Sequence, residues 1–140
     1  MNSSLNIALA QIAPVWLNQQ ATIEKIIEAL ESAANKDAQL VAFGEGLLPG
    51  YPFWLELTGG AEFNSQKQKE IHAHYVRNAV SIEDGDLDSI CAACKQYQLA
   101  CYLGTIEKAK NRGGKSLYCC LLYTSPSPRD LSTSRMPSSA

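Results

Sequence analysis

Residues 40–57 read LVAFGEGLLPGYPFWLEL. The apolar run at 40–43 is typical of a buried strand, and the glycine- and proline-containing loop after it carries one carboxylate, Glu45. In open α/β sheets, functional groups lie in the crevice outside the carboxyl ends of the strands. Glu45 is therefore a candidate catalytic residue, although a lone glutamate in such a turn is more often a solvated surface charge.

The segments before this stretch predict a βαβ unit. Residues 6–11, NIALAQ, predict a buried first strand. Between residues 18 and 35, apolar side chains recur at helical spacing with glutamates on the other side, and Asn18 is the expected N-cap. Because strand, helix and strand follow each other through short links, strands 6–11 and 40–43 are expected to run parallel.

The segments after the loop add further helices and strands. Helices are expected near residues 66–80 and 87–97. Residues 99–106, LACYLGTI, predict a third strand in which Gly104 marks a bulge or a close backbone approach. A fourth strand beginning at residues 116–119 is its expected hairpin partner. The chain is therefore assigned to the α/β class, with a strand order that the sequence leaves open.

Composition excludes several classes of function. The 140 residues carry a formal charge of -2, with 46% hydrophobic and 19% charged residues, so there is no basic footprint for nucleic acid and no polybasic membrane patch. No apolar run approaches the roughly 18 residues of a membrane span, and no signal peptide is recognisable at the N-terminus. Five cysteines without a disulfide-like framework favour a cytoplasmic location.

Residues 120–140 differ in composition from the rest. Eleven of these 21 residues are Ser, Thr or Pro, and apolar periodicity ends after Tyr123, which predicts disorder. Residues 120–130, CLLYTSPSPRD, resemble the translation of a DNA-sequencing adapter. The expected organisation is therefore residues 1–119 as a folded portion of a domain and residues 120–140 as a non-native tail. On this hypothesis the natural reading frame continues beyond Cys119.

Three segments together resemble the nitrilase superfamily, the carbon–nitrogen hydrolases. They are FGEGLLPGYPFW at residues 43–54, KQKEIHAHYVRNAV at 67–80 and YLGTIEKAKNRGGKSLY at 102–118. The resemblance is closer to the nitrilase branch than to the amidase branches, and Gly44 stands where many relatives have proline. It implies that residues 1–119 form the N-terminal part of an α-β-β-α sandwich. It also implies that the parent protein is a homo-oligomer.

The chemistry implied by the resemblance is hydrolysis of a nitrile to a carboxylic acid and ammonia. The family uses a glutamate general base, a lysine and a nucleophilic cysteine, without metal or organic cofactor. Only the glutamate carries over, to Glu45. No lysine of this chain stands in the His-Arg-Lys-like motif, and the motif around the nucleophilic cysteine is missing. The chain alone is therefore expected to be inactive.

Three alternatives stay open at this point. The first is that the parent belongs to the amidase or carbamoyl-amide hydrolase branch of the same superfamily, with a small amide as substrate. The chain could instead be a non-catalytic α/β binding module that kept the fold without the triad. It could also be an inactive truncated product. The motifs that follow Cys119 in the natural gene would distinguish these alternatives.

The remaining cysteines are interpreted as small buried hydrophobic residues. Cys91 and Cys94 form a C-x-x-C pair, but they lie in the middle of a predicted helix rather than at its start, and no second ligand pair exists for zinc. Cys101 and Cys119, in the third and fourth predicted strands, receive the same interpretation.

Other polar and aromatic residues are weighed in the same way. Glu107, beside two lysines after the third strand, is interpreted as a solvated charge. His72 and His74 are two residues apart on a helix, so they cannot share a metal ion. Tyr51 and Trp54 could line a substrate pocket or pack in the core, and the sequence does not decide between these roles.

Overall fold

The computed structural model describes residues 4–109 and 116–124 with their side chains, and residues 131–136 as backbone. Five strands form one mixed sheet in the order β1-β2-β3-β4-β5. The strands are β1 (Ile7–Ala10), β2 (Leu40–Phe43), β3 (Ala100–Lys108), β4 (Leu117–Thr124) and β5 (Leu131–Met136). The helices are α1 (Gln19–Ala34), α2 (Trp54–Leu57), α3 (Gln66–Asn78) and α4 (Asp88–Tyr97), with a 3-10 turn at Ile82–Asp84. The predicted α/β class is confirmed.

The predicted βαβ unit is present. β1 and β2 pair in parallel, and β2 pairs in parallel with β3. Helix α1 connects the first two strands, and the Asn18 side chain accepts a hydrogen bond from the backbone N–H of Ala21 at 3.0 Å, as expected of its N-cap. The predicted hairpin is also confirmed, because β3 and β4 pair antiparallel.

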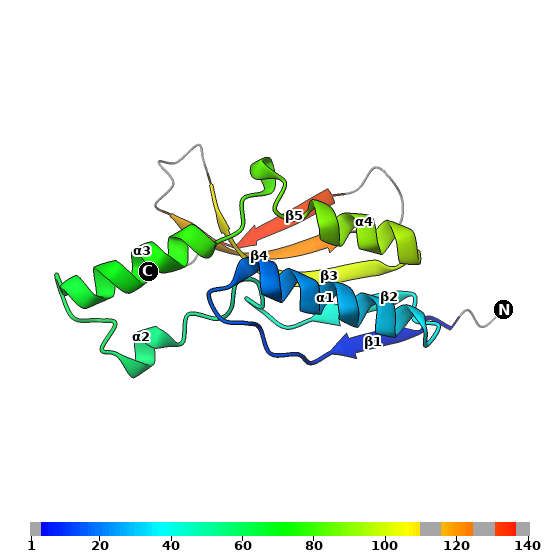
Figure 1. The fold of residues 1–140 in the computed structure, drawn as a ribbon, viewed down its shortest axis with the longest axis horizontal. Coiled ribbons are helices and arrows are strands. Elements are labelled where there is room, and N and C mark those ends of the chain that lie inside the picture. Colours follow the sequence, from blue (N-terminus) through cyan, green and yellow to red (C-terminus); the bar gives the residue numbers. More distant parts are fainter. Residues whose placement is uncertain (1–3, 110–115, 125–130, 137–140) are drawn as a thin grey trace.

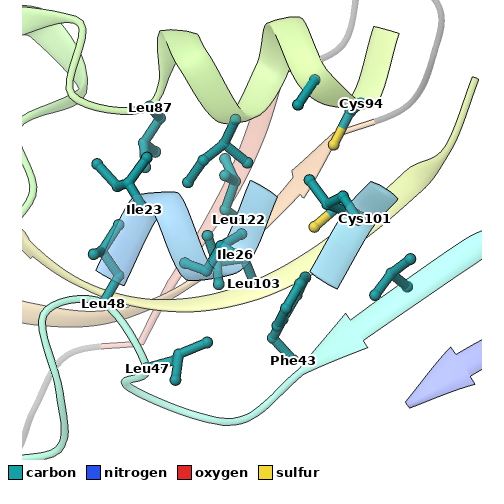
Figure 2. Close-up of a cluster of buried hydrophobic side chains, with 14 of the residues drawn as sticks. Ile23, Ile26, Phe43, Leu47, Leu48, Leu87, Cys94, Cys101, Leu103 and Leu122 are labelled. Atoms are coloured by element: carbon teal, nitrogen blue, oxygen red, sulfur yellow. The ribbon is translucent and has the colours of Figure 1, made fainter. Parts of the chain in front are cut away.

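One face of the sheet is covered by two helices. Figure 1 shows α1 and α4 lying side by side across the sheet. The side chains that meet between helices and strands include Ile26 from α1, Ile90 from α4 and Leu103 from β3, all fully buried. Figure 2 shows this cluster, with Leu122 of β4 and Cys101 of β3 pointing into it. Apolar residues recur at helical spacing in α1 and α4 because one stripe of each helix is buried against the sheet.

The opposite face of the sheet is open. In the pairing register, Leu9 stands beside Ala42, Ala42 beside Tyr102 and Tyr102 beside Tyr123, so these residues share one face. Leu9 is 81% exposed and Tyr102 is 36% exposed. The prediction of a buried first strand is therefore wrong. β1 is an edge strand whose larger apolar side chains, Ile7 and Leu9, point to the open face and are exposed there. On this face, α2 and α3 pack only at the far end of β3, against Ile106.

Strand β4 continues beyond the predicted boundary at residue 119. Cys120 and Leu122 alternate onto the helix-covered face and are 4% and 0% exposed. The expectation of disorder is wrong for residues 120–124, because two apolar side chains there complete the core. β5 likewise lies within the expected tail and pairs antiparallel with β4. Residues 125–130 and 137–140 are outside the described residues, and the non-native origin of the tail stays a prediction.

Within the described part of the chain, none of the helices combines the length and the apolar character needed to cross a membrane.

Candidate active site

Glu45 lies in the loop that follows β2, and this loop passes over β3 at Gly104. A Cβ atom built on Gly104 would lie 2.6 Å from the Cα of Glu45 and closer still to the carbonyl oxygen of Gly44. Only glycine permits such an approach, so the predicted close backbone contact at this residue is confirmed. The Glu45 side chain is exposed on the open face of the sheet.

Beyond Glu45, the loop rejoins the sheet. The N–H of Leu48 donates to the carbonyl of Gly104 at 3.3 Å, and the N–H of Ile106 donates to the carbonyl of Leu48 at 2.8 Å. Leu48 is fully buried and therefore anchors the loop on the helix-covered side. Glu45 thus lies on a short arch, residues 44–50, that begins at the end of β2 and is hydrogen-bonded to β3 through Leu48.

The turn Pro49–Pro52 is held from two further directions. The N–H of Gly50 donates to the carbonyl of Gly46 at 3.1 Å, which closes the arch on itself. The indole N–H of Trp16 donates to the carbonyl of Tyr51 at 3.2 Å. Gly50 has φ +126 and lies so close to the Trp16 ring that a Cβ atom would collide with it. Glycine is therefore required here on two grounds.

Tyr75, from α3, reaches the same turn. Its hydroxyl donates to the carbonyl of Gly50 at 2.6 Å, and its ring lies 4.5 Å from that of Trp54, centroid to centroid. The side chain is 1% exposed, and burial raises the pKa of the Tyr75 phenol above its ordinary value. The hydroxyl therefore stays protonated and remains a donor. Tyr75 was not among the predicted site residues, because nothing in the sequence spacing of α3 connects it with the loop.

Cys119, on the open face of β4, contacts the candidate base directly. Its thiol donates to Oε1 of Glu45 at 3.4 Å. Burial, followed by the hydrogen bond to Glu45 and its charge, raises the pKa of the Cys119 thiol. The interpretation of Cys119 as a buried core thiol is wrong, because it is half-buried and lies beside a carboxylate. A thiol in this state keeps its proton and is not an activated nucleophile.

Glu107 also differs from its prediction. It lies within β3 and is 3% exposed, so it is not a solvated charge at a loop edge. The thiol of Cys120 donates to its Oε2 at 3.2 Å. In the strand register Glu107 faces the opposite side from Ile106 and Cys119, so its side chain points away from the Glu45 site. The burial arises because β3 extends two residues further than the sequence pattern indicates.

The prediction that the C-x-x-C pair is buried in the core is confirmed for Cys94 but not for Cys91. Cys94 is fully buried and meets the equally buried Cys101 of β3, whereas Cys91 is half-buried. The hydrogen bond with Cys94, followed by burial, raises the pKa of the Cys101 thiol. All five cysteines are free thiols. The described residues contain no group of three or more potential ligands that could hold a metal ion.

A cavity of about 480 Å³ lies between the loop before α1, the segment around α2 and helix α3. It is lined mainly by apolar and aromatic side chains: Trp16, Leu17, Phe53, Trp54, Leu57, Thr58, Glu70, Ile71 and His74. Trp54 is 5% exposed and packs against Tyr75, so it has the core-packing role of the two that the sequence left open, and it also lines this cavity. Tyr51 is 54% exposed and is not among the lining residues. A role of the cavity in substrate binding stays a prediction.

In this mixed sheet the carboxylate lies just beyond the carboxyl end of a parallel strand, which is where open α/β sheets bind their ligands. The family model described as carbon-nitrogen hydrolase matches residues 6–135. This chain belongs to the carbon–nitrogen hydrolase family, as the resemblance of its motifs implied.

Curated relatives share about a third of their aligned residues with this chain. An arylacetonitrilase of Aspergillus oryzae is 31% identical over 109 residues, which are 78% of this chain and 31% of the relative. A nitrilase of Meyerozyma guilliermondii is 32% identical over 122 residues, 87% of this chain and 36% of the relative. The chain thus spans about a third of the length of these relatives.

Solved structures show the same fold at lower identity. A glutamate-to-leucine mutant of the amidase from Nesterenkonia sp. AN1, with the acetamide moiety of fluoroacetamide added at its active-site cysteine, has a TM-score of 0.61 at 16% identity. The alignment covers 94% of this chain and 42% of the amidase. A carbon–nitrogen hydrolase from Helicobacter pylori G27 has a TM-score of 0.58 at 15% identity, with 94% and 39% covered.

Proposed function

We propose that Glu45 is the general base of a nitrilase-type hydrolase, to which this chain contributes the N-terminal part of the domain. The observation that carries the proposal is the position of the Glu45 carboxylate, held by a closed arch on the open face of the sheet. Relatives named nitrilase and arylacetonitrilase support the nitrile as substrate class. The parent would release a carboxylic acid and ammonia.

In this proposal Glu45 performs two proton transfers. It takes the proton of a cysteine thiol supplied by the rest of the parent, and the thiolate attacks the nitrile carbon. The proton passes to the nitrile nitrogen, which gives a thioimidate and leaves Glu45 as the carboxylate again. It then activates the water molecules that release ammonia and the acid. A lysine beside the substrate nitrogen would stabilise the charge that develops there. No lysine or cysteine of this chain stands in the motifs that carry these two residues in the family.

The test begins by sequencing the genomic locus downstream of the codon for Cys119. A frame that continues into a His-Arg-Lys-like motif and then a cysteine motif supports the proposal, and the extended protein is then assayed with nitriles and the corresponding amides. We expect Glu45→Gln to lower kcat/KM by at least about 10²-fold, since general acid–base catalysis contributes that much. Glu56→Gln, an exposed carboxylate on the nearby helix α2, is the matched control.

Two results would contradict the proposal. Full activity of the Glu45→Gln variant would remove Glu45 from the mechanism. Turnover of amides but not of nitriles would place the parent in the amidase branch instead. We also propose a cytoplasmic location, in keeping with the free thiols, and assembly of the parent into a homo-oligomer.

A further inference from the structure

Tyr75 attaches helix α3 to the arch that carries Glu45. It is the only buried residue of α3, at 1% exposed, and its hydroxyl donates to the carbonyl of Gly50 at 2.6 Å. A buried phenol that loses its acceptor is costly, so the hydroxyl and this carbonyl hold each other in place. The ring packs on Trp54, which fixes its direction.

The hydrogen bond to Gly50 reaches Glu45 through a short path. The N–H of Gly50 donates to the carbonyl of Gly46 at 3.1 Å, and Gly46 is the next residue after Glu45. Both glycines have positive φ, +59 and +126, so the backbone at each end of this hydrogen bond rotates easily unless it is held. Tyr75 therefore restrains the part of the arch that contains these two glycines.

The reactivity of a neighbouring thiol, Cys119, reports the position of the Glu45 carboxylate. Cys119 of β4 donates to Oε1 of Glu45 at 3.4 Å, and Tyr75 lies close enough to Cys119 to interact with it electrostatically. The titratable side chains at this place are Glu45 from the arch, Tyr51 after it and Tyr75 from α3.

We propose that Tyr75 is a positioning residue for Glu45: by holding the carbonyl of Gly50 it fixes the arch so that the carboxylate stays over the open face of β4. The structural part of this inference stands on the contacts alone. Its catalytic meaning rests on the proposed function, because a general base must be held within hydrogen-bond reach of the proton it takes.

The experiment measures alkylation of Cys119 by iodoacetamide between pH 6.5 and 10 in the 140-residue protein. Fragment-ion mass spectrometry separates Cys119 from the buried Cys120, and the buried Cys94 reports whether the core stays folded. Because the thiolate is the reacting form and a nearby carboxylate disfavours it, displacement of Glu45 lowers the pKa of Cys119 and accelerates the reaction at neutral pH.

We expect Tyr75→Phe, which removes only the hydroxyl, to accelerate alkylation of Cys119 at pH 7.5 by about three- to tenfold, since one pKa unit changes the thiolate fraction tenfold. Glu45→Gln should give a similar increase, and the double variant should add nothing further. Tyr102→Phe is the matched control. It removes a hydroxyl from the same open face, and its ring packs on Tyr123 rather than on the arch.

A wild-type Cys119 profile in Tyr75→Phe, together with a shifted profile in Glu45→Gln, would overturn the proposal. A lower melting temperature without that shift would mean that Tyr75 is only structural. Unshifted profiles in both variants would remove the Glu45–Cys119 contact and the proposal with it. Because the readout needs no substrate, it can succeed even if the extended protein fails to hydrolyse nitriles, so the two proposals fail separately.

Discussion

The two faces of the same sheet have different roles. On the face beneath α1 and α4, Val41, Cys101 and Leu122 are all fully buried. On the other face, the neighbouring residues Tyr102 and Leu121 are 36% and 43% exposed. The strands supply apolar side chains to both faces. Helices α1 and α4 cover one face (Figure 1), whereas on the other face α2 and α3 contact the sheet only near Ile106 and Cys119.

The candidate site lies entirely on the less complete face. Glu45 and Cys119 meet there, while the helix-covered face holds the arch through Leu48. The residues that stabilise the core and those of the candidate site therefore lie on different faces. The core is closely packed, while the carboxylate keeps access to solvent. An apolar face of this kind is normally covered by a partner surface. In the α-β-β-α sandwich implied by the family, a second sheet would supply that cover.

The largest expected effect compares adjacent residues of β4. Leu122→Ala should lower the free energy of unfolding by about 2–5 kcal/mol, because it opens a cavity in the core. Leu121→Ala, on the open face, should cost less than about 1 kcal/mol. Urea unfolding measures both. Equal, small losses would mean that residues 120–124 add nothing to the fold, as their composition suggested.

A smaller effect is expected where the arch crosses β3. Gly104→Ala should destabilise the protein by about 1–3 kcal/mol, since the new methyl group would displace the backbone at Glu45. Gly44→Ala is the control, because a Cβ atom there meets nothing within 4 Å, and its cost should stay within about 0.5 kcal/mol. Similar unfolding curves for the two variants would show that the arch does not lie against Gly104.

The smallest effect is expected at the edge of the open face. Leu9→Thr should change the free energy of unfolding by less than about 0.5 kcal/mol, because Leu9 is 81% exposed. It should nevertheless reduce light scattering by the purified chain, since it interrupts an apolar surface along an edge strand. Val41→Thr, which puts a hydroxyl into the core, should be clearly destabilising. A large loss of stability in Leu9→Thr would indicate that β1 is covered after all.

The sequence predicted the elements better than their surroundings. The helices, the parallel β1–β2 pair and the β3–β4 hairpin follow from local periodicity, because each pattern is contained in one segment. The burial of β1 was predicted wrongly because an alternating strand shows that one face is apolar but not whether anything covers it. Glu107 was misplaced for a related reason, since its burial depends on how far β3 and β4 pair.

The amino-acid sequence by itself determined the βαβ unit, the strand-to-loop position of Glu45 and, through three motifs, the family. These are local features, encoded by residues close together in the chain. Only the tertiary structure brought Tyr75 to Gly50 and Cys119 to Glu45, across 25 and 74 residues of sequence. Such contacts depend on strand order and on the path of the arch over Gly104, which no local pattern specifies.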